Sequence, residues 1–359
     1  MQINKIYHKI FASAMLILLM ASCEKEIKFN GDIVQPMMVV NGLITPDSTI
    51  RIHLSKSRFF LSNNEKTEDI PNAAIDIYIN GQAKGKMQYK ESGIYTSSIR
   101  PSIYDTVKLV IADTDIQGVQ SEVVIPRQSI LQSVDTATQT IRNEIYEFDG
   151  YNMVPTGRYS YMKELTVKLT IKDPPAIENF YRLNIKMRTQ MHYPDTTYTW
   201  EGGGEIHYAD TTVVWEEYEY FYLEGTETPN ESLLGFIDII NSSAYSYTIT
   251  DEFFDGKDKT LKFKFLYTSP KIGDSTGSEE DGENYYPTTF RTPDSQSKQL
   301  TVNLQSISKE MYLYFKTKEN ADNVFDTFFT EPVQIYSNIK NGMGVLGAYT
   351  NKEIKIELP

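Results

Sequence analysis

The chain contains a single cysteine, Cys23, directly after a short apolar segment near the N-terminus. Residues 10–21 carry no charged side chain, and Lys5 and Lys9 precede them. A bilayer-spanning helix needs about 20 apolar residues, whereas a basic start and a shorter apolar segment are typical of a secretory signal peptide. The small alanine and serine before the cysteine complete a lipobox, the bacterial pattern that directs thioether acylation of the thiol.

Cys23 is therefore predicted to be the lipidation site and, after removal of residues 1–22, the mature N-terminus. Acyl chains such as palmitate would hold it in the bilayer, because each buried methylene adds about 0.8 kcal/mol and two chains give stable anchoring. Residues 23–35 would form a lipidated polar tether. The alternative, an exposed free thiol, has little use in an exported protein.

Composition excludes one class of partner. The chain has 35 Lys and Arg against 48 Asp and Glu, a formal net charge of −13. An acidic surface repels phosphates and the sequence has no basic stripe, so nucleic-acid binding is excluded. Because Cys23 has no second cysteine to pair with inside the chain, stability must come from hydrophobic cores.

Residues 201–227 combine eight carboxylates with aromatic rings and contain no lysine or arginine. Tyr and Trp dominate binding hot spots, so this segment is a candidate surface for a small ligand, glycan, peptide or partner protein. The alternative is a strand packed between the core and a neighbour, since both of its faces are partly apolar. The candidate binding residues are Trp215, Tyr218, Tyr220 and Tyr222.

The segment DEFFDGKD resembles part of an EF-hand loop, yet Phe253 and Lys262 occupy positions where calcium needs oxygen ligands. A β-turn led by Asp255 and Gly256 explains it better. No metal or cofactor is therefore predicted. The candidates for a calcium site of another kind are Asp251, Asp255 and Asp258.

Other catalytic groups lack a supporting pattern. His53, His192 and His207 do not have the spacing of zinc ligands, and no G-x-S-x-G elbow is present. Glycoside hydrolysis needs two carboxylates about 5–10 Å apart, and the sequence alone cannot select a pair among 48 acids. No catalytic residue is identified, which favours a non-enzymatic role and leaves a carboxylate-based hydrolase as the alternative.

The elements that must position these residues are strands. In the segment IDIYIN, residues 75–80, Ile75, Ile77 and Ile79 alternate with polar side chains, the period of a strand with one buried face. Asn-Gly and Ser-Gly pairs supply hairpin turns. The pattern predicts an all-β protein: an immunoglobulin- or transthyretin-like sandwich over residues 36–127, then a larger β-rich domain over 128–359. One amphipathic helix is expected near 306–322, after a serine start.

Several segments together resemble one family. The lipobox, VVNGLIT, DPPAIENFYRLNI, FDGK (254–257) and EPVQIYSNIKNGMGVLGAY (331–349) resemble a Bacteroidota outer-membrane lipoprotein family catalogued as domain of unknown function 4249. The resemblance implies a gene typically beside a TonB-dependent receptor, and hence an accessory role in capture or uptake. It implies no catalytic residues. The acidic residues behind Cys23 resemble a signal for export to the cell surface.

The sequence thus predicts an exported, lipid-anchored outer-membrane lipoprotein, exposed at the cell surface. Its expected partners are the lipid bilayer, a TonB-dependent outer-membrane receptor and an unidentified ligand. Two other classes stay open: a surface hydrolase acting on glycan or peptide, and a structural or adhesive envelope protein.

Overall fold

Alternation of apolar and polar side chains produces strands along most of the chain, which confirms the all-β class. The computed structural model describes residues 35–58, 68–148, 150–200, 204–219, 221–223, 240–243, 246–252, 254–267, 294–324 and 334–358. Cys23 and Tyr220 lie outside these ranges, as do the predicted signal peptide and nearly all of the tether. No helix in the described part of the chain is long and apolar enough to cross a membrane.

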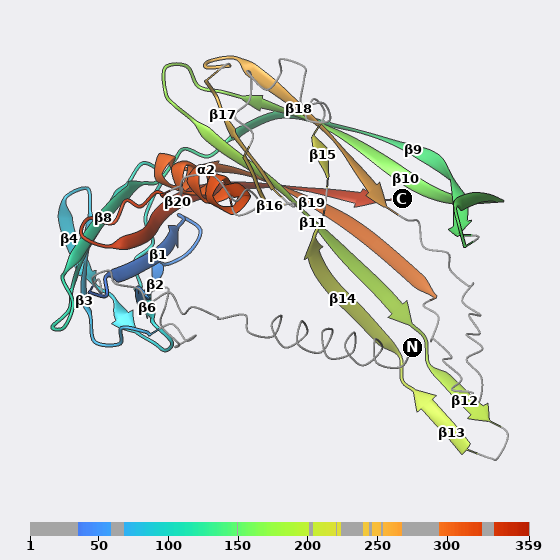
Figure 1. Ribbon diagram of the computed structural model, residues 1–359, viewed down its shortest axis with the longest axis horizontal. Coiled ribbons are helices and arrows are strands. Elements are labelled where there is room, and N and C mark those ends of the chain that lie inside the picture. The colour runs from blue at the N-terminus through green and yellow to red at the C-terminus, as the bar shows by residue number, and fades with distance from the viewer. Residues whose placement is uncertain are drawn as a thin grey trace, which may run out of the picture. The chain divides into compact units, whose positions relative to one another are not determined.

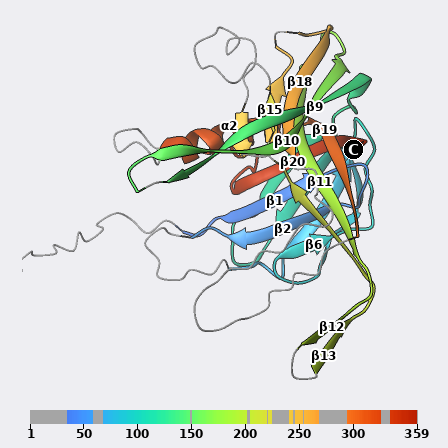
Figure 2. The ribbon, with the colours of Figure 1, turned by 90° about the vertical axis from the view of Figure 1, so that its right-hand side faces the viewer.

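The first core lies between two sheets. One contains β5, β6, β2 and β1, continued by β20, which runs parallel to β1 (Figure 2). The other has the order β4-β3-β7-β8. The bounds are β1 (Met38–Ile44), β2 (Arg51–Lys56), β3 (Ala74–Ile79), β4 (Gln82–Lys86), β5 (Gln88–Tyr89), β6 (Ile94–Thr96), β7 (Thr106–Ala112), β8 (Val119–Val124) and β20 (Met343–Leu358).

The alternating isoleucines of β3 are buried in this first core, as their period of two predicts. Ile339, Leu346 and Ala348 from the C-terminal segment are buried in the same core. Residues 36–127 therefore share their core with the end of the chain. The predicted domain boundary at residue 127 stays a prediction.

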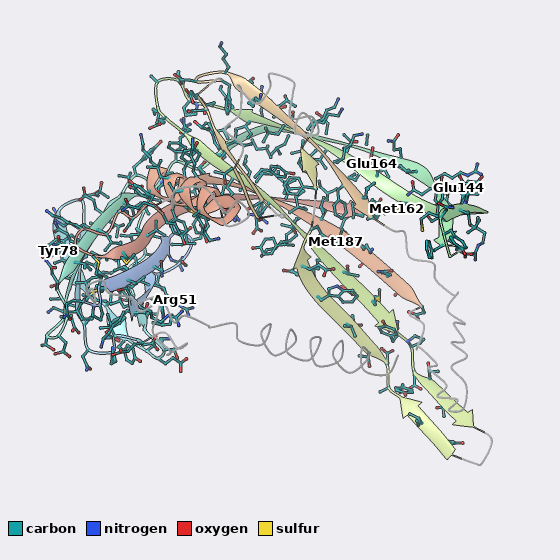
Figure 3. The ribbon with its side chains drawn as sticks, viewed as in Figure 1. Arg51, Tyr78, Glu144, Met162, Glu164 and Met187 are labelled. Atoms are coloured by element: carbon teal, nitrogen blue, oxygen red, sulfur yellow. The ribbon has the colours of Figure 1, made fainter. Side chains whose placement is uncertain are left out.

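The second core lies where the ten-stranded sheet continues through β20, β19, β11, β17 and β16 and faces a sheet of order β15-β18-β10-β9. Met187 of β11 is one of its buried side chains (Figure 3). The bounds are β9 (Ile130–Phe148), β10 (Met153–Lys172), β11 (Phe180–Tyr193), β15 (Tyr222–Leu223), β16 (Ile240–Ser243), β17 (Ser246–Thr250), β18 (Asp258–Tyr267) and β19 (Ser295–Ile307).

Three further strands lie beside or beyond the C-terminal end of β11 (Figure 1). Strands β12 (Thr196–Trp200) and β13 (Gly204–Tyr208) pair only with each other, as a hairpin, among the described strands. Strand β14 (Thr211–Tyr218) pairs antiparallel with β11 from Lys186 to Tyr193. The acidic aromatic segment is thus divided between a hairpin and a strand that extends the main sheet.

The helix α2 (Lys309–Val324) begins after Ser308, whose hydroxyl accepts a hydrogen bond from the Met311 amide at 3.3 Å. It packs on the face of the ten-stranded sheet opposite the second core. Phe180 of β11 and Tyr312 of α2 stack there with ring centroids 4.5 Å apart, beside Ile307 and Met311. The helix therefore covers one end of this sheet face, and the strand residues further along carry polar side chains.

Candidate functional site

The structure places Trp215 and Tyr218 on β14 but on opposite faces of the sheet. Trp215 is in register with Thr189, on the face of β11 that carries the second core. Tyr218 is in register with Lys186, on the face that carries α2, and the Lys186 ammonium lies 4.9 Å from the ring centroid. These two predicted binding residues are therefore not brought together.

The other two predicted aromatic residues do not extend the patch. Tyr222 belongs to β15 and pairs with Lys264 of β18, in the opposing sheet. Tyr220 lies outside the described residues. Phe221, between them, is 2% exposed and packs edge-to-face against Phe263 in the second core. Only Tyr218 remains on a face of the sheet that also contains a cavity.

A cluster of three aspartates connects the segment after β10 with the segment between β17 and β18, about 80 residues later in the sequence. Carboxylate oxygens of Asp173, Asp251 and Asp255 lie within 4.8 Å of one another. Asp258 is not part of this cluster, because it begins β18 and pairs with Lys172. Asp173, which follows β10, was missed by sequence reasoning; its only local signal is the Asp-Pro-Pro sequence that ends the strand.

The three carboxylates each bind backbone of the opposite segment. Asp173 accepts hydrogen bonds from the Tyr181 hydroxyl (2.5 Å) and the Gly256 amide (2.9 Å). Asp251 accepts from the Asn179 amide (2.7 Å), and Asp255 from Ala176 (2.8 Å).

Three carboxylates this close are the donor set that a hard divalent cation such as Ca²⁺ prefers. Their hydrogen bonds also have a structural role, because they hold the two segments together. Burial raises the pKa of Asp251, the hydrogen bonds from Asn179 oppose this shift, and the charges of Asp173 and Asp255 raise the pKa further. Folding therefore disfavours the ionised form of Asp251 relative to the same carboxylate in the unfolded chain.

We expect Asp251→Asn to raise the free energy of unfolding at neutral pH, because the amide removes a charge that burial and the neighbouring acids disfavour. A raised pKa means that the fold favours the protonated acid, so wild-type stability falls as pH rises through the folded pKa of Asp251. The amide keeps an oxygen acceptor for Asn179 and carries no charge. Thermal melts at neutral and acidic pH check this, since the difference should vanish once the wild-type acid is protonated. A lower melting temperature for the variant, reproduced in the wild type by EDTA, would instead indicate a bound cation.

The histidines form ion pairs with nearby acids. His192 lies between Asp294 (Nδ1 to Oδ1, 2.6 Å) and Asp210 (Nε2 to Oδ1, 2.9 Å), and these hydrogen bonds raise its pKa. His207 lies 3.4 Å from Asp195. Among the described residues, the metal-type cluster contains no histidine. His192 thus joins the ends of β11, β14 and β19.

A cavity of about 340 Å³ lies on the α2 face of the ten-stranded sheet. Its polar lining comes from five strands, and Leu43 of β1 and Met311 of α2 close it on the apolar side. The polar lining residues are Arg182, Asn184, Tyr218, Ser246, Gln305 and Tyr349. We refer to this set as the Arg182 pocket.

Strand register explains why these side chains meet. Arg182 of β11 is directly opposite Thr248 of β17 on one side and Gln305 of β19 on the other. Directly paired residues share a face, and residues two apart along β11 share it too. Asn184 and Lys186 therefore follow Arg182 toward Tyr218, while Tyr181 and Leu183 enter the second core.

The Arg182 guanidinium has few partners. Its Nη2 donates to the Ser246 hydroxyl at 3.0 Å, and its central carbon lies 4.5 Å from the Phe315 ring centroid. Its Nε is buried without a hydrogen-bond partner. Burial lowers the pKa of Arg182, an effect that Tyr218 opposes. No carboxylate within the described ranges forms a salt bridge with this partly buried charge.

Two neighbours in the same row are also unsatisfied. The Thr248 hydroxyl and the Gln305 amide oxygen are buried with no hydrogen-bond partner. Buried polar groups are nearly always hydrogen-bonded, so a cluster of three requires an explanation. Sequence reasoning missed this site; the available signal was an arginine between two core residues in the strand FYRLNI.

The fold and the site define an all-β protein with a small polar pocket on one face of its central sheet. The chain belongs to the family described as domain of unknown function (DUF4249), which it matches over residues 24–355. The resemblance found in the sequence motifs is thereby confirmed. The Bacteroidota origin and the neighbouring receptor stay predictions.

No curated protein matches the chain. Among solved structures it is similar to a protein from Corynebacterium diphtheriae described as a proposed membrane-anchored protein, with 8% identity and a TM-score of 0.20. The match covers 77% of this chain and 55% of that one, so the chain spans about half of its length. Carbohydrate-binding modules of the β-sandwich superfamily match at 8% identity and a TM-score of 0.16, over 65% of this chain and 97% of theirs. Similarity at this level carries no functional argument.

Proposed function

We propose that this protein is a lipid-anchored lipoprotein of the outer membrane, exposed at the cell surface, that captures a small ligand for a TonB-dependent receptor. The observation that carries the proposal is the Arg182 pocket, where a partly buried cation has no acidic partner among the described residues and the neighbouring Thr248 hydroxyl and Gln305 amide oxygen are buried without hydrogen bonds. Such a pocket on a rigid sheet suits binding, because its polar groups are already held in place.

The N-terminal sequence supports the anchor. A lipobox ending at Cys23 and a short polar stretch would attach the folded part to the bilayer by acyl chains. The receptor partnership rests on the family resemblance.

The two other classes have less support. The aspartate cluster is the only group of acids in the described part of the chain with metal-type spacing, and its carboxylates accept backbone hydrogen bonds that join two segments. A hydrolase would need acids free to exchange protons with a substrate. A purely adhesive protein gives no reason for an unsatisfied cation beneath a helix.

We expect Cys23→Ala to move the protein from the membrane to the soluble fraction, because no other residue can form the thioether. Affinity purification of the tagged wild type from native membranes should recover a TonB-dependent receptor, and the variant should recover much less. Fractionation with identification of co-purified proteins measures both effects. Cys23→Ser is a matched control, since its smaller change of side chain should have the same result. A variant that stays in the membrane, or a wild type recovered without any such receptor, would contradict the proposal.

A further inference from the structure

We propose that the Arg182 pocket binds the carboxylate of a small polar molecule. This inference rests on the proposed capture function and names the chemical class of the captured ligand. It follows from the charge, the geometry and the lining of the pocket.

Arg182 is a partly buried cation without an acidic partner. The chain carries 48 acidic residues, yet none in the described ranges pairs with Arg182. Removing a guanidinium from water is costly unless an anion compensates it. In an acidic protein, folding could readily have supplied a carboxylate partner. Because no carboxylate of the described residues pairs with Arg182, an anionic group of a bound ligand can take that position.

The geometry favours a planar anion. The guanidinium is a flat fork whose parallel N–H groups match the two oxygens of a carboxylate. Contact with the Phe315 ring fixes the plane, and the hydrogen bond to Ser246 fixes one end. Among the described residues Ser246 is its only hydrogen-bond partner, so the guanidinium keeps further N–H groups for a ligand. Because the protein already holds this fork, little conformational entropy is lost when a carboxylate binds.

The lining indicates what else the ligand carries. The Asn184 amide oxygen accepts from Asn303 at 3.0 Å, so its NH₂ group can donate to a ligand. Gln305 also lines the pocket, and Tyr218 and Tyr349 offer rings with hydroxyl groups. A volume of about 340 Å³ suits one small molecule. Sugar acids and acylated amino acids both combine a carboxylate with hydroxyl or amide groups.

The test compares acids with matched neutral molecules. Calorimetric titration of the purified protein would use glucuronate against glucose, and N-acetylglycine against N-acetylglycinamide. We expect at least one acid to bind about 30-fold or more tightly than its neutral partner, because the neutral molecule leaves the guanidinium unpaired. The two pairs distinguish a sugar source of the carboxylate from an amino-acid source. Equal binding of acid and neutral partner, binding of inorganic phosphate alone, or binding of neither acid would overturn the inference.

Variants separate binding from folding. Arg182→Met keeps the length of the side chain and its contact with Phe315, and we expect it to lose the preference for the acid. Without ligand its melting temperature should equal or exceed that of the wild type, because a partly buried charge without an acidic partner is removed. Arg188→Met is the matched control: it removes the same charge from an exposed position further along the same face of β11.

Arg182→Lys keeps the charge without the fork and should weaken binding roughly tenfold. Wild-type affinity in Arg182→Met, or a strongly lowered melting temperature in both Arg182 variants, would show that the arginine is structural. These results are independent of the membrane and receptor test on Cys23. A neutral ligand bound equally well would refute the carboxylate while leaving the capture function in place.

Discussion

Removal of the C-terminal strand, residues 343–359, is expected to unfold both cores. Strand β20 pairs with β1 in parallel and with β19 antiparallel, so its loss opens the ten-stranded sheet at its centre. Leu346 and Ala348 are fully buried in the first core, and Ile354 and Ile356 pack against the second. Each large apolar side chain contributes about 1.5–3 kcal/mol on burial, against a typical total stability of about 5–15 kcal/mol.

Circular dichroism melts of residues 36–359 and 36–342 measure this effect. The longer fragment should melt cooperatively, and the shorter one should show no cooperative transition. A 36–127 fragment adds a test of the boundary predicted from the sequence, since it lacks Ile339, Leu346 and Ala348 from its core. Cooperative melting of the 36–342 fragment within a few degrees of the longer one would contradict this account of β20.

Gly344→Ala is expected to destabilise the protein by more than about 3 kcal/mol. Gly344 has a φ of 99°, and an added Cβ would lie 2.2 Å from the carbonyl oxygen of Val40. The clash is with backbone of the paired strand β1, so neither strand can yield without breaking the β1–β20 ladder. Asn341, with φ 63°, completes the turn that leads into β20.

Gly81→Ala is the matched control for this substitution. Gly81 also has positive φ, 79°, but an added Cβ there meets nothing within 4 Å. It isolates the conformational cost, about 1 kcal/mol. Thermal or urea melts of the two variants should therefore differ by more than about 2 kcal/mol. Equal losses would mean that the contact with Val40 relaxes without cost.

Local sequence patterns predicted the strands and the helix, because the alternation of apolar and polar side chains that marks each element lies within a few neighbouring residues. The isoleucines of β3 alternate in the sequence and are buried in the structure. The helix begins directly after Ser308, its serine cap, and the Asn80-Gly81 pair forms a predicted hairpin turn with positive φ at both residues. Each of these features depends on fewer than about 20 consecutive residues.

Pairings between distant residues could not be predicted this way. Nothing local to β1 indicates that residues 39–44 pair with 343–348, and this pairing joins the first core to the end of the chain. The aspartate cluster likewise needs Asp173 beside Asp251, which no spacing rule connects. Pairing of segments this far apart has a loop-closure entropy cost, and the contacts that offset this cost come from the whole fold.

The residues of the candidate site could not be predicted from the sequence either, because they meet only through the pairing of distant strands. Composition singled out residues 201–227 as one surface, and the structure separates Trp215, Tyr218 and Phe221 among two sheet faces and a core. In the sequence, Arg182 is one polar residue within the strand segment FYRLNI. Its importance depends on the register that places it between Thr248 and Gln305, both unsatisfied.

The account depends most on the lipid anchor, because a capture protein must stay beside its receptor. The direct measurement is the mass of the N-terminal peptide of the protein extracted from its native membrane. We predict a peptide that begins at Cys23 and carries acyl chains, with residues 1–22 absent. A mature protein that retains residues 1–22, or begins at Cys23 with an unmodified thiol, would contradict the account.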